Sequence, residues 1–238
     1  MAKMRLENDP IETLKHHLGN DIEYSGINIV YPIWREVEKD QDVEHFFLKF
    51  YKGFINRPSL RISNPTKTIP DSAIDKLLKA RIEQLSDFDI TLIRFGHRLS
   101  MAAENIIGLI LEEYIHNALI DKGWSCCWGN CIGAVDFCSK DGTLIQVKNK
   151  SNTENSSSNK IRKGTDIKKW YRLNALNGKT RWDDLNQITR CTNLLSEDKF
   201  QIFASNLIKE NPSALYVNEK ELASISKGLQ KNRGISLE

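Results

Sequence analysis

The stretch of sequence that decides the fold lies between residues 133 and 172 and reads GAVDFCSKDGTLIQVKNKSNTENSSSNKIRKGTDIKKWYR. Its first half predicts a β-hairpin, because two runs rich in Val, Ile, Leu and Phe flank a turn signal that ends at Gly142. These runs are residues 134–138 and 143–149. A three-residue loop with Gly142 in the left-handed conformation is the connection we expect between them.

This register brings three polar side chains together on an otherwise apolar hairpin. A loop of that length would place Asp136 opposite Gln146. Alternation along the second strand then puts Leu144, Gln146 and Lys148 on one face. A carboxylate, an amide and an ammonium group therefore converge, which is the arrangement of a small metal site with a cation beside it.

Such a site suits phosphodiester hydrolysis. Mg²⁺ takes oxygen ligands, for which Asp136 and Gln146 are the candidates. The metal would polarise a phosphate and activate a water, and Lys148 would stabilise the developing charge. The spacing D-x9-Q-x-K resembles the PD-(D/E)XK nuclease signature, with Gln146 where an acid is usual. Either another acid completes the site or cleavage is lost. The alternative is an exposed hairpin that carries ordinary polar residues.

The segment that follows the hairpin has the composition of a DNA-binding surface. From Lys148 to Arg172 the chain carries eight Lys or Arg residues and two acids. Lys and Ser side chains contact phosphates, and Asn and Arg also contact base edges. A flexible linker is the alternative. The candidate DNA contacts are Asn149, Lys150, Asn152, Asn155, Ser156, Ser157, Ser158, Lys160, Arg162, Lys163, Lys168, Lys169 and Arg172.

The same residues resemble a known family. The run VKNKSNTENSSSNKIRKGTDIKKWYR, behind VDF and ahead of Lys179-Thr180-Arg181-Trp182, is similar to the SinI family of type II restriction endonucleases. The resemblance is most specific from Glu104 to about Trp182. It implies a PD-(D/E)XK fold, Mg²⁺-dependent cleavage of double-stranded DNA and a homodimer. The type member of this family acts on a GGWCC-like palindrome.

Glu104 is our candidate for the acid that compensates for Gln146. It begins a predicted helix, 104–120, and shares a face with Leu111 and Ile115. A carboxylate at the head of an apolar stripe is costly unless it is paired or bound to a metal. The alternative is that Glu104 only caps the first turn. Glu112 and Glu113 are expected on solvated or lateral faces.

Length and composition place the chain among globular proteins. It has 238 residues with a net charge of +3, so any evidence for nucleic-acid binding lies in how the positive charges cluster. We expect a mainly helical region over residues 1–100 and a catalytic core over 101–238. The first residues lack the apolar core of a signal peptide, and no run is long enough to span a bilayer. We therefore expect a cytoplasmic protein.

Several further segments carry local expectations. A helix over 72–85 should direct Ile74, Leu77, Leu78 and Ile82 inward, and 214–217 should form a short strand. The loop 57–70 offers Arg57, Arg61, Asn64, Lys67 and Thr68 as possible DNA contacts, or is simply an exposed polar loop. The cysteines, at positions 126, 127, 131, 138 and 191, favour buried thiols over zinc, because no CxxC pair or nearby His accompanies them.

The sequence therefore predicts an α/β protein with a central mixed sheet flanked by helices, acting as a Mg²⁺-dependent type II restriction endonuclease. Asp136 and Gln146 would hold the metal, Lys148 would orient the attacking water and Glu104 would be an accessory ligand. The partners would be double-stranded DNA and a second copy, and a matching methyltransferase would act on the same site. The alternatives are a DNA-binding protein with a decayed site and a structure-selective nuclease.

Overall fold

The computed structural model describes residues 10–38, 42–65, 71–151 and 166–232. The chain divides into two compact units. Unit 1 consists of residues 1–61 and 107–211, and unit 2 of residues 62–106 and 212–238. The long helix α6 (Asp87–Leu119) belongs to both, so the boundary expected near residue 100 lies within a helix.

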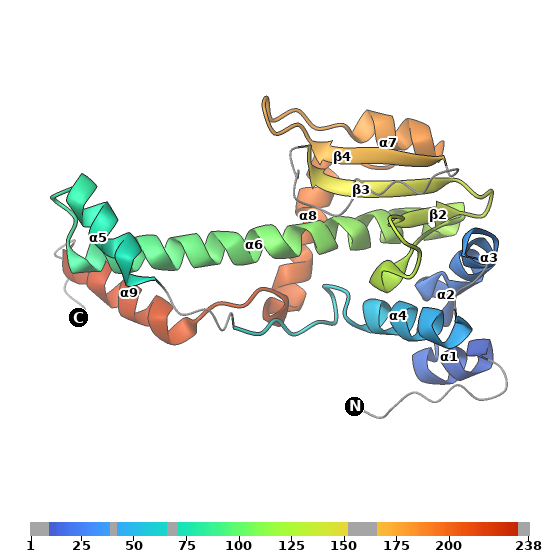
Figure 1. Ribbon diagram of the computed structural model, residues 1–238, viewed down its shortest axis with the longest axis horizontal. Helices are drawn as coiled ribbons and strands as arrows, with labels where there is room; N and C mark the ends of the chain where they lie inside the picture. The colour runs from blue at the N-terminus through green and yellow to red at the C-terminus, as the bar shows by residue number, and fades with distance from the viewer. Residues whose placement is uncertain (1–9, 39–41, 66–70, 152–165, 233–238) are drawn as a thin grey trace. The chain divides into compact units, whose positions relative to one another are not determined.

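Unit 1 is built on one mixed four-stranded sheet in the order β1-β2-β3-β4 (Figure 1). Strands β1, β2 and β3 pair antiparallel, and β4 joins β3 in parallel. The strands span Trp124–Cys126, Phe137–Ser139, Leu144–Lys150 and Ile167–Leu173. The predicted α/β class, with a mixed sheet flanked by helices, is confirmed.

The β2–β3 hairpin has the predicted turn and register. Gly142 has a φ of 84°, and its N–H donates to the carbonyl oxygen of Ser139 at 3.0 Å. Phe137 pairs with Ile145, so the residue before it, Asp136, lies opposite Gln146 as expected. The short turn fixes this register because a slip by one residue would move every side chain to the other face.

Helices surround the sheet of unit 1. They are α1 (Pro10–Leu18), α2 (Asp21–Ser25), α3 (Ile27–Val37), α4 (Val43–Ile55), α7 (Trp182–Thr189) and α8 (Glu197–Glu210), with 3₁₀ turns over Ile120–Lys122 and Trp128–Asn130. The start of α8 is fixed by Ser196, whose hydroxyl accepts from the N–H of Lys199. Within the described residues, no helix combines the length and apolarity that crossing a membrane requires.

Aromatic side chains fill two parts of the unit 1 core. Between α3 and α4, Trp34 stacks on Phe46 with ring centroids 4.4 Å apart. Beside β4, Trp182 packs against Trp170 at 5.2 Å and against Tyr114 of α6 at 5.6 Å. Burying these large rings supplies much of the hydrophobic stabilisation of the unit. The second cluster also joins α6 to β4 and α7.

Unit 2 consists of α5 (Ser72–Arg81), the first part of α6, a 3₁₀ turn over Pro212–Ala214 and α9 (Glu219–Asn232). The expected strand over 214–217 is absent. The expected inward direction of Ile74, Leu77 and Ile82 is also wrong, because all three side chains are exposed. The reason is that α5 is attached to α6 through polar contacts, such as the 2.6 Å ion pair between Asp75 and Arg94.

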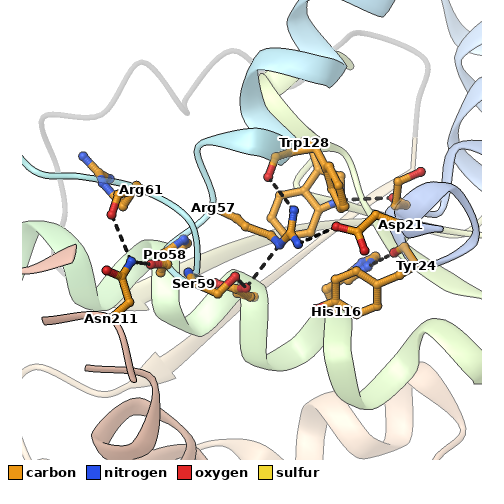
Figure 2. A network of polar contacts seen from close by, with 12 residues as sticks. Asp21, Tyr24, Arg57, Pro58, Ser59, Arg61, His116, Trp128 and Asn211 are labelled. Carbon is orange, nitrogen blue, oxygen red and sulfur yellow. Dashed lines mark hydrogen bonds and ion pairs between the residues drawn. The ribbon is translucent and has the colours of Figure 1, made fainter. Parts of the chain in front are cut away.

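A buried polar network anchors the C-terminal half of α6 in unit 1 (Figure 2). Glu113, which is 2% exposed, accepts from the N–H of Ser59 at 2.9 Å and pairs with Arg57 at 3.5 Å. Arg57 also pairs with Asp21 at 3.1 Å. The expectation that Glu113 is solvated is therefore wrong. Its charge is tolerated inside because a cation and two donors of Ser59 compensate it.

His116 provides a second anchor, one turn further along α6. Its Nδ1 accepts from the N–H of Cys126 at 3.1 Å, so Nε2 carries the proton and donates to the carbonyl oxygen of Tyr24 at 2.6 Å. The side chain is fully buried, and burial lowers its pKa to about 4. The neutral ring thus joins α6 to both α2 and β1.

The His116 anchor predicts an acid sensitivity. Because the folded pKa is depressed, the unfolded chain binds the proton first as the pH falls below about 6.5, and the stability from His116 is lost towards pH 4. The native protein should lose about 2 kcal/mol through this residue between about pH 7 and pH 5. Urea unfolding of His116→Gln should show a drop smaller by that amount. His97→Gln, at an exposed histidine of α6, is the matched control and should keep the native drop.

Candidate active site

Asp136 is held at the start of the hairpin by main-chain groups. Its own N–H donates to the carbonyl oxygen of Ile145 at 2.9 Å, and its carboxylate Oδ2 accepts from the N–H of Val147 at 2.7 Å. Its carbonyl oxygen accepts from the N–H of Cys127 at 2.8 Å. Two main-chain bonds fix the backbone of Asp136 and a third fixes its carboxylate through Oδ2, which leaves Oδ1 as the oxygen that could bind a ligand.

Gln146 and Lys148 share a face of β3. Gln146 is only 5% exposed, whereas Lys148 is partly buried. The positive charge of Lys148 lowers the pKa of Asp136, although burial has the larger effect and the net shift of that pKa is upward. The charges of Asp136 and Lys148 are therefore close enough to interact. The predicted convergence of Asp136, Gln146 and Lys148 agrees with this register and with these electrostatics.

Glu112 is a fourth member of the site that the sequence analysis missed. It lies on α6 and is partly buried. Its pKa is raised to about 8, mainly by burial and also by the negative charge of Asp136, while Lys148 opposes the shift. Two carboxylates from different elements thus meet beside one lysine. The sequence feature that could have revealed it is the pair of adjacent acids, Glu112 and Glu113, within an otherwise apolar part of the predicted helix 104–120.

The donor set fits a hard divalent cation. Two partly buried carboxylates near one another are electrostatically unfavourable: burial raises the pKa of both, and the negative charge of Asp136 also raises that of Glu112. A divalent cation would relieve it, with the amide oxygen of Gln146 as a further neutral ligand. Within the described ranges, no three side chains of the His, Cys, Asp and Glu types are grouped to hold a metal. The candidate set is two acids and an amide.

Glu104, the accessory ligand expected from sequence, is placed differently from Glu112. It is an exposed residue of unit 2, whereas Asp136 and Lys148 belong to unit 1. Glu112 follows it by eight residues along the same helix. Its role as a ligand remains a prediction, which variants of both residues can test.

The candidate DNA-binding residues fall into three groups. Lys168 and Lys169 are exposed on β4, and Asn149 and Lys150 end β3. Arg172 is buried, and its guanidinium donates to Asn149 at 2.9 Å and pairs with Glu197 at 2.5 Å. The remaining candidates lie outside the described residues, namely Asn152, Asn155, Ser156, Ser157, Ser158, Lys160, Arg162 and Lys163.

The basic residues at the start of the 57–70 loop have structural contacts. Arg57 is 7% exposed and belongs to the network that anchors α6 (Figure 2). The carbonyl oxygens of Pro58 and Arg61 each accept from the side chain of Asn211 at 2.9 Å. Arg57 is thus buried in the protein interior, whereas Asn64 is exposed. Lys67 and Thr68 lie outside the described residues.

Comparison with known proteins identifies the family of this chain. The sequence pattern of the family described as SinI restriction endonuclease matches residues 35–210. The type II restriction enzyme Eco47I of Escherichia coli is 36% identical over 178 residues, which are 73% of this chain and 75% of that protein. The type II restriction enzyme SinI of Salmonella infantis is 38% identical over 151 residues, which are 61% and 65% of the two chains.

The matched region contains Glu112, Asp136, Gln146 and Lys148, together with the whole sheet. It covers well over half of the chain. The chain belongs to the SinI family of restriction endonucleases.

Proposed function

We propose that this protein is a type II restriction endonuclease that hydrolyses phosphodiester bonds of double-stranded DNA at a short palindromic site, with Mg²⁺ as cofactor. The observation that carries the proposal is the meeting of Glu112 and Asp136 beside Lys148. Family membership supports a site-specific nuclease. A GGWCC-like palindrome is the first recognition sequence to test.

Each side chain of the site has a distinct role in this reaction. Asp136 and Glu112 would hold the cofactor, and the hydrogen bond from the N–H of Val147 fixes the carboxylate of Asp136. Lys148 orients the attacking water and stabilises the negative charge that develops on the phosphate. Gln146 contributes an oxygen ligand and no charge. A bound Mg²⁺ would supply Lewis-acid activation of the phosphate and of the water.

The presence of Glu112 argues against the alternative of a DNA-binding protein with a decayed catalytic site. That alternative rests on Gln146, which leaves Asp136 as the only acid of the D…QxK pattern. A carboxylate from α6 restores the second negative charge that the pattern lacks. This favours cleavage over binding alone. A structure-selective nuclease of the same fold is disfavoured by the basic, amide-rich segment 149–172, which suits reading of base edges.

We also propose that the active form is a homodimer, because two strands must be cut and a two-fold protein matches a palindrome. Unit 2 offers a surface for it. Large apolar side chains are exposed there, at Ile74, Leu77, Ile82, Ile93, Met101 and Leu222. The described residues of unit 2 carry eight basic and eight acidic side chains. A neutral, apolar surface suits a protein partner and does not attract a phosphate backbone.

A restriction enzyme of this kind would work in the cytoplasm as part of a restriction-modification pair. A methyltransferase that modifies the same sequence would protect the host DNA. The two enzymes need share only the recognition site, so the proposal requires no surface on this chain for the methyltransferase.

The central test is digestion of long double-stranded DNA with Mg²⁺. The native protein should give discrete fragments with one shared terminal sequence. Asp136→Ala should cut at least about a hundredfold more slowly, because a metal ligand is lost, while its DNA binding without metal stays within a few fold. Random degradation would contradict site specificity. Full activity of Asp136→Ala would contradict the assignment of the site.

Variants of the two candidate acids on α6 identify the accessory ligand. Glu112→Gln should lower the cleavage rate by at least about a hundredfold, because it removes one of the two charges that hold the cation. It should also abolish the rise in melting temperature that Mg²⁺ gives the native protein. Glu104→Gln is the matched control, on the same helix with the same change of charge, and should behave as native in both measurements. The reverse pattern would make Glu104 the ligand.

A variant of unit 2 tests the homodimer. Leu77→Asp places a charge on a side chain that is 70% exposed, so it should spare the fold and prevent burial against a partner. Sedimentation should show a native dimer and a monomeric variant, and the variant should nick supercoiled DNA more readily than it cuts both strands. Ile202→Asp, at an exposed position of α8, should remain dimeric. A dimeric Leu77→Asp protein would place the interface elsewhere.

A further inference from the structure

The loop between β4 and α7 carries one highly exposed leucine. Leu176 is 97% exposed, the highest value among the large apolar side chains in the described residues. This connection projects beyond the ends of the strands (Figure 1). We call residues 174–179 the tip loop; their sequence is NALNGK.

The tip loop is held in one shape by its own hydrogen bonds. The N–H of Asn174 donates to the carbonyl oxygen of Lys179, and the N–H of Gly178 donates back to that of Asn174, both at 2.9 Å. The side chain of Asn174 accepts from the N–H of Leu176 at 2.9 Å. Gly178 has a φ of 69°, which suits glycine at this turn. Leu176 is therefore exposed on a loop whose backbone is already held in one shape.

The loop also has a fixed place relative to the active site. Lys148 of β3 pairs with Tyr171 of β4, and Lys150 pairs with Leu173, the last residue before the loop. A bond from the N–H of Ala175 to the hydroxyl of Ser151, at 3.0 Å, ties the loop to the end of β3 as well. The tip loop therefore leaves the sheet just beyond the level of Lys148, from β4, the strand paired with the one that carries Gln146 and Lys148.

The charge of this segment indicates what lies against it. From Ile167 to Arg181 the chain contains five Lys or Arg residues and no acid. Lys168 and Lys169 are exposed before the loop, and Lys179 is exposed within it. An exposed leucine on a loop that carries Lys179, after a strand that carries Lys168 and Lys169, suits a duplex, whose phosphates attract the lysines and whose base stack is apolar.

We propose that Leu176 is a wedge that enters the base stack of the bound duplex and unstacks one step beside the cleavage site. The inference rests on the proposed function, since it requires a DNA substrate at this face. The lysines contact the flanking phosphates, and the rigid tip loop presents the leucine without an ordering cost at binding. Unstacking would bend the duplex and bring the scissile phosphate to the site.

Other occupants fit the tip loop less well. A membrane surface would need more apolar area than one leucine supplies, and the neighbouring asparagines and glycine add none. A second copy would bring the exposed lysines of the two segments together, because a two-fold contact places like residues near one another. Either occupant appears as a distinct outcome of the test.

The test uses full-length protein and a short duplex that spans a cleavage junction found by digesting long DNA. The fluorescent base 2-aminopurine replaces each adenine near the junction in turn, and binding is measured without divalent metal. The native protein and Leu176→Met should raise the fluorescence at one position, since both side chains are apolar and long. Leu176→Ala should abolish the rise and weaken binding about tenfold or more. Ile202→Ala, a change of the same kind at an exposed site on α8, should behave as native.

A mismatch at the responsive step separates a wedge from an ordinary contact. The mismatch removes stacking in advance, so the difference in affinity between native protein and Leu176→Ala should shrink by at least about half on a logarithmic scale. Absence of any fluorescence rise with the native protein would overturn the inference, as would a Leu176→Ala protein that binds and unstacks like native. A change only in oligomeric state or in vesicle binding would also overturn it. If the native protein cuts no duplex, the proposed function itself fails.

Discussion

The attachment of α6 to the core of unit 1 is the constraint on which the active site depends. Glu113 is fixed by Arg57 and Ser59, and His116 by main-chain groups of α2 and β1. These anchors lie one and four residues after Glu112. They therefore fix both the rotation of the helix about its axis and its position along that axis at this point. A helix free to turn by one residue would direct Glu112 about 100° away from Asp136.

The same attachment explains why a protein keeps two buried acids together. Without a cation both acids favour their protonated forms, Asp136 because of burial and Glu112 because of burial and the negative charge of Asp136. The main-chain bond to Asp136 and the anchors of α6 hold them there. A divalent ion bound at this candidate site would relieve that cost, so the unfavourable electrostatics of the folded protein would favour its binding.

The hairpin half of the site was predictable because it is local. Turn chemistry at Gly142 and alternation along β3 are set by neighbours in sequence, and they place Asp136, Gln146 and Lys148 correctly relative to one another. Glu112 lies on a helix that precedes the sheet in the sequence. The direction of its side chain depends on the packing of that helix around Arg57 and His116. Periodicity located only the second half of this helix: it begins at Asp87, so Glu104 lies inside it and does not cap its first turn. Periodicity also did not identify Glu112 as the acid that interacts with Asp136.

Periodicity also failed in unit 2, for a related physical reason. Ile74 and Leu77 have the spacing of an inward-facing helix. An apolar stripe, however, indicates only that a helix face favours burial and does not identify the element that would bury it. In unit 1 that element is the sheet. In unit 2 the neighbouring helices meet α5 through charged groups, which leaves the stripe open. Local charge separates the two kinds of surface: the segment 167–181 is basic throughout and suits DNA, whereas the balanced charges of unit 2 leave apolar contact with another protein chain as the stronger attraction.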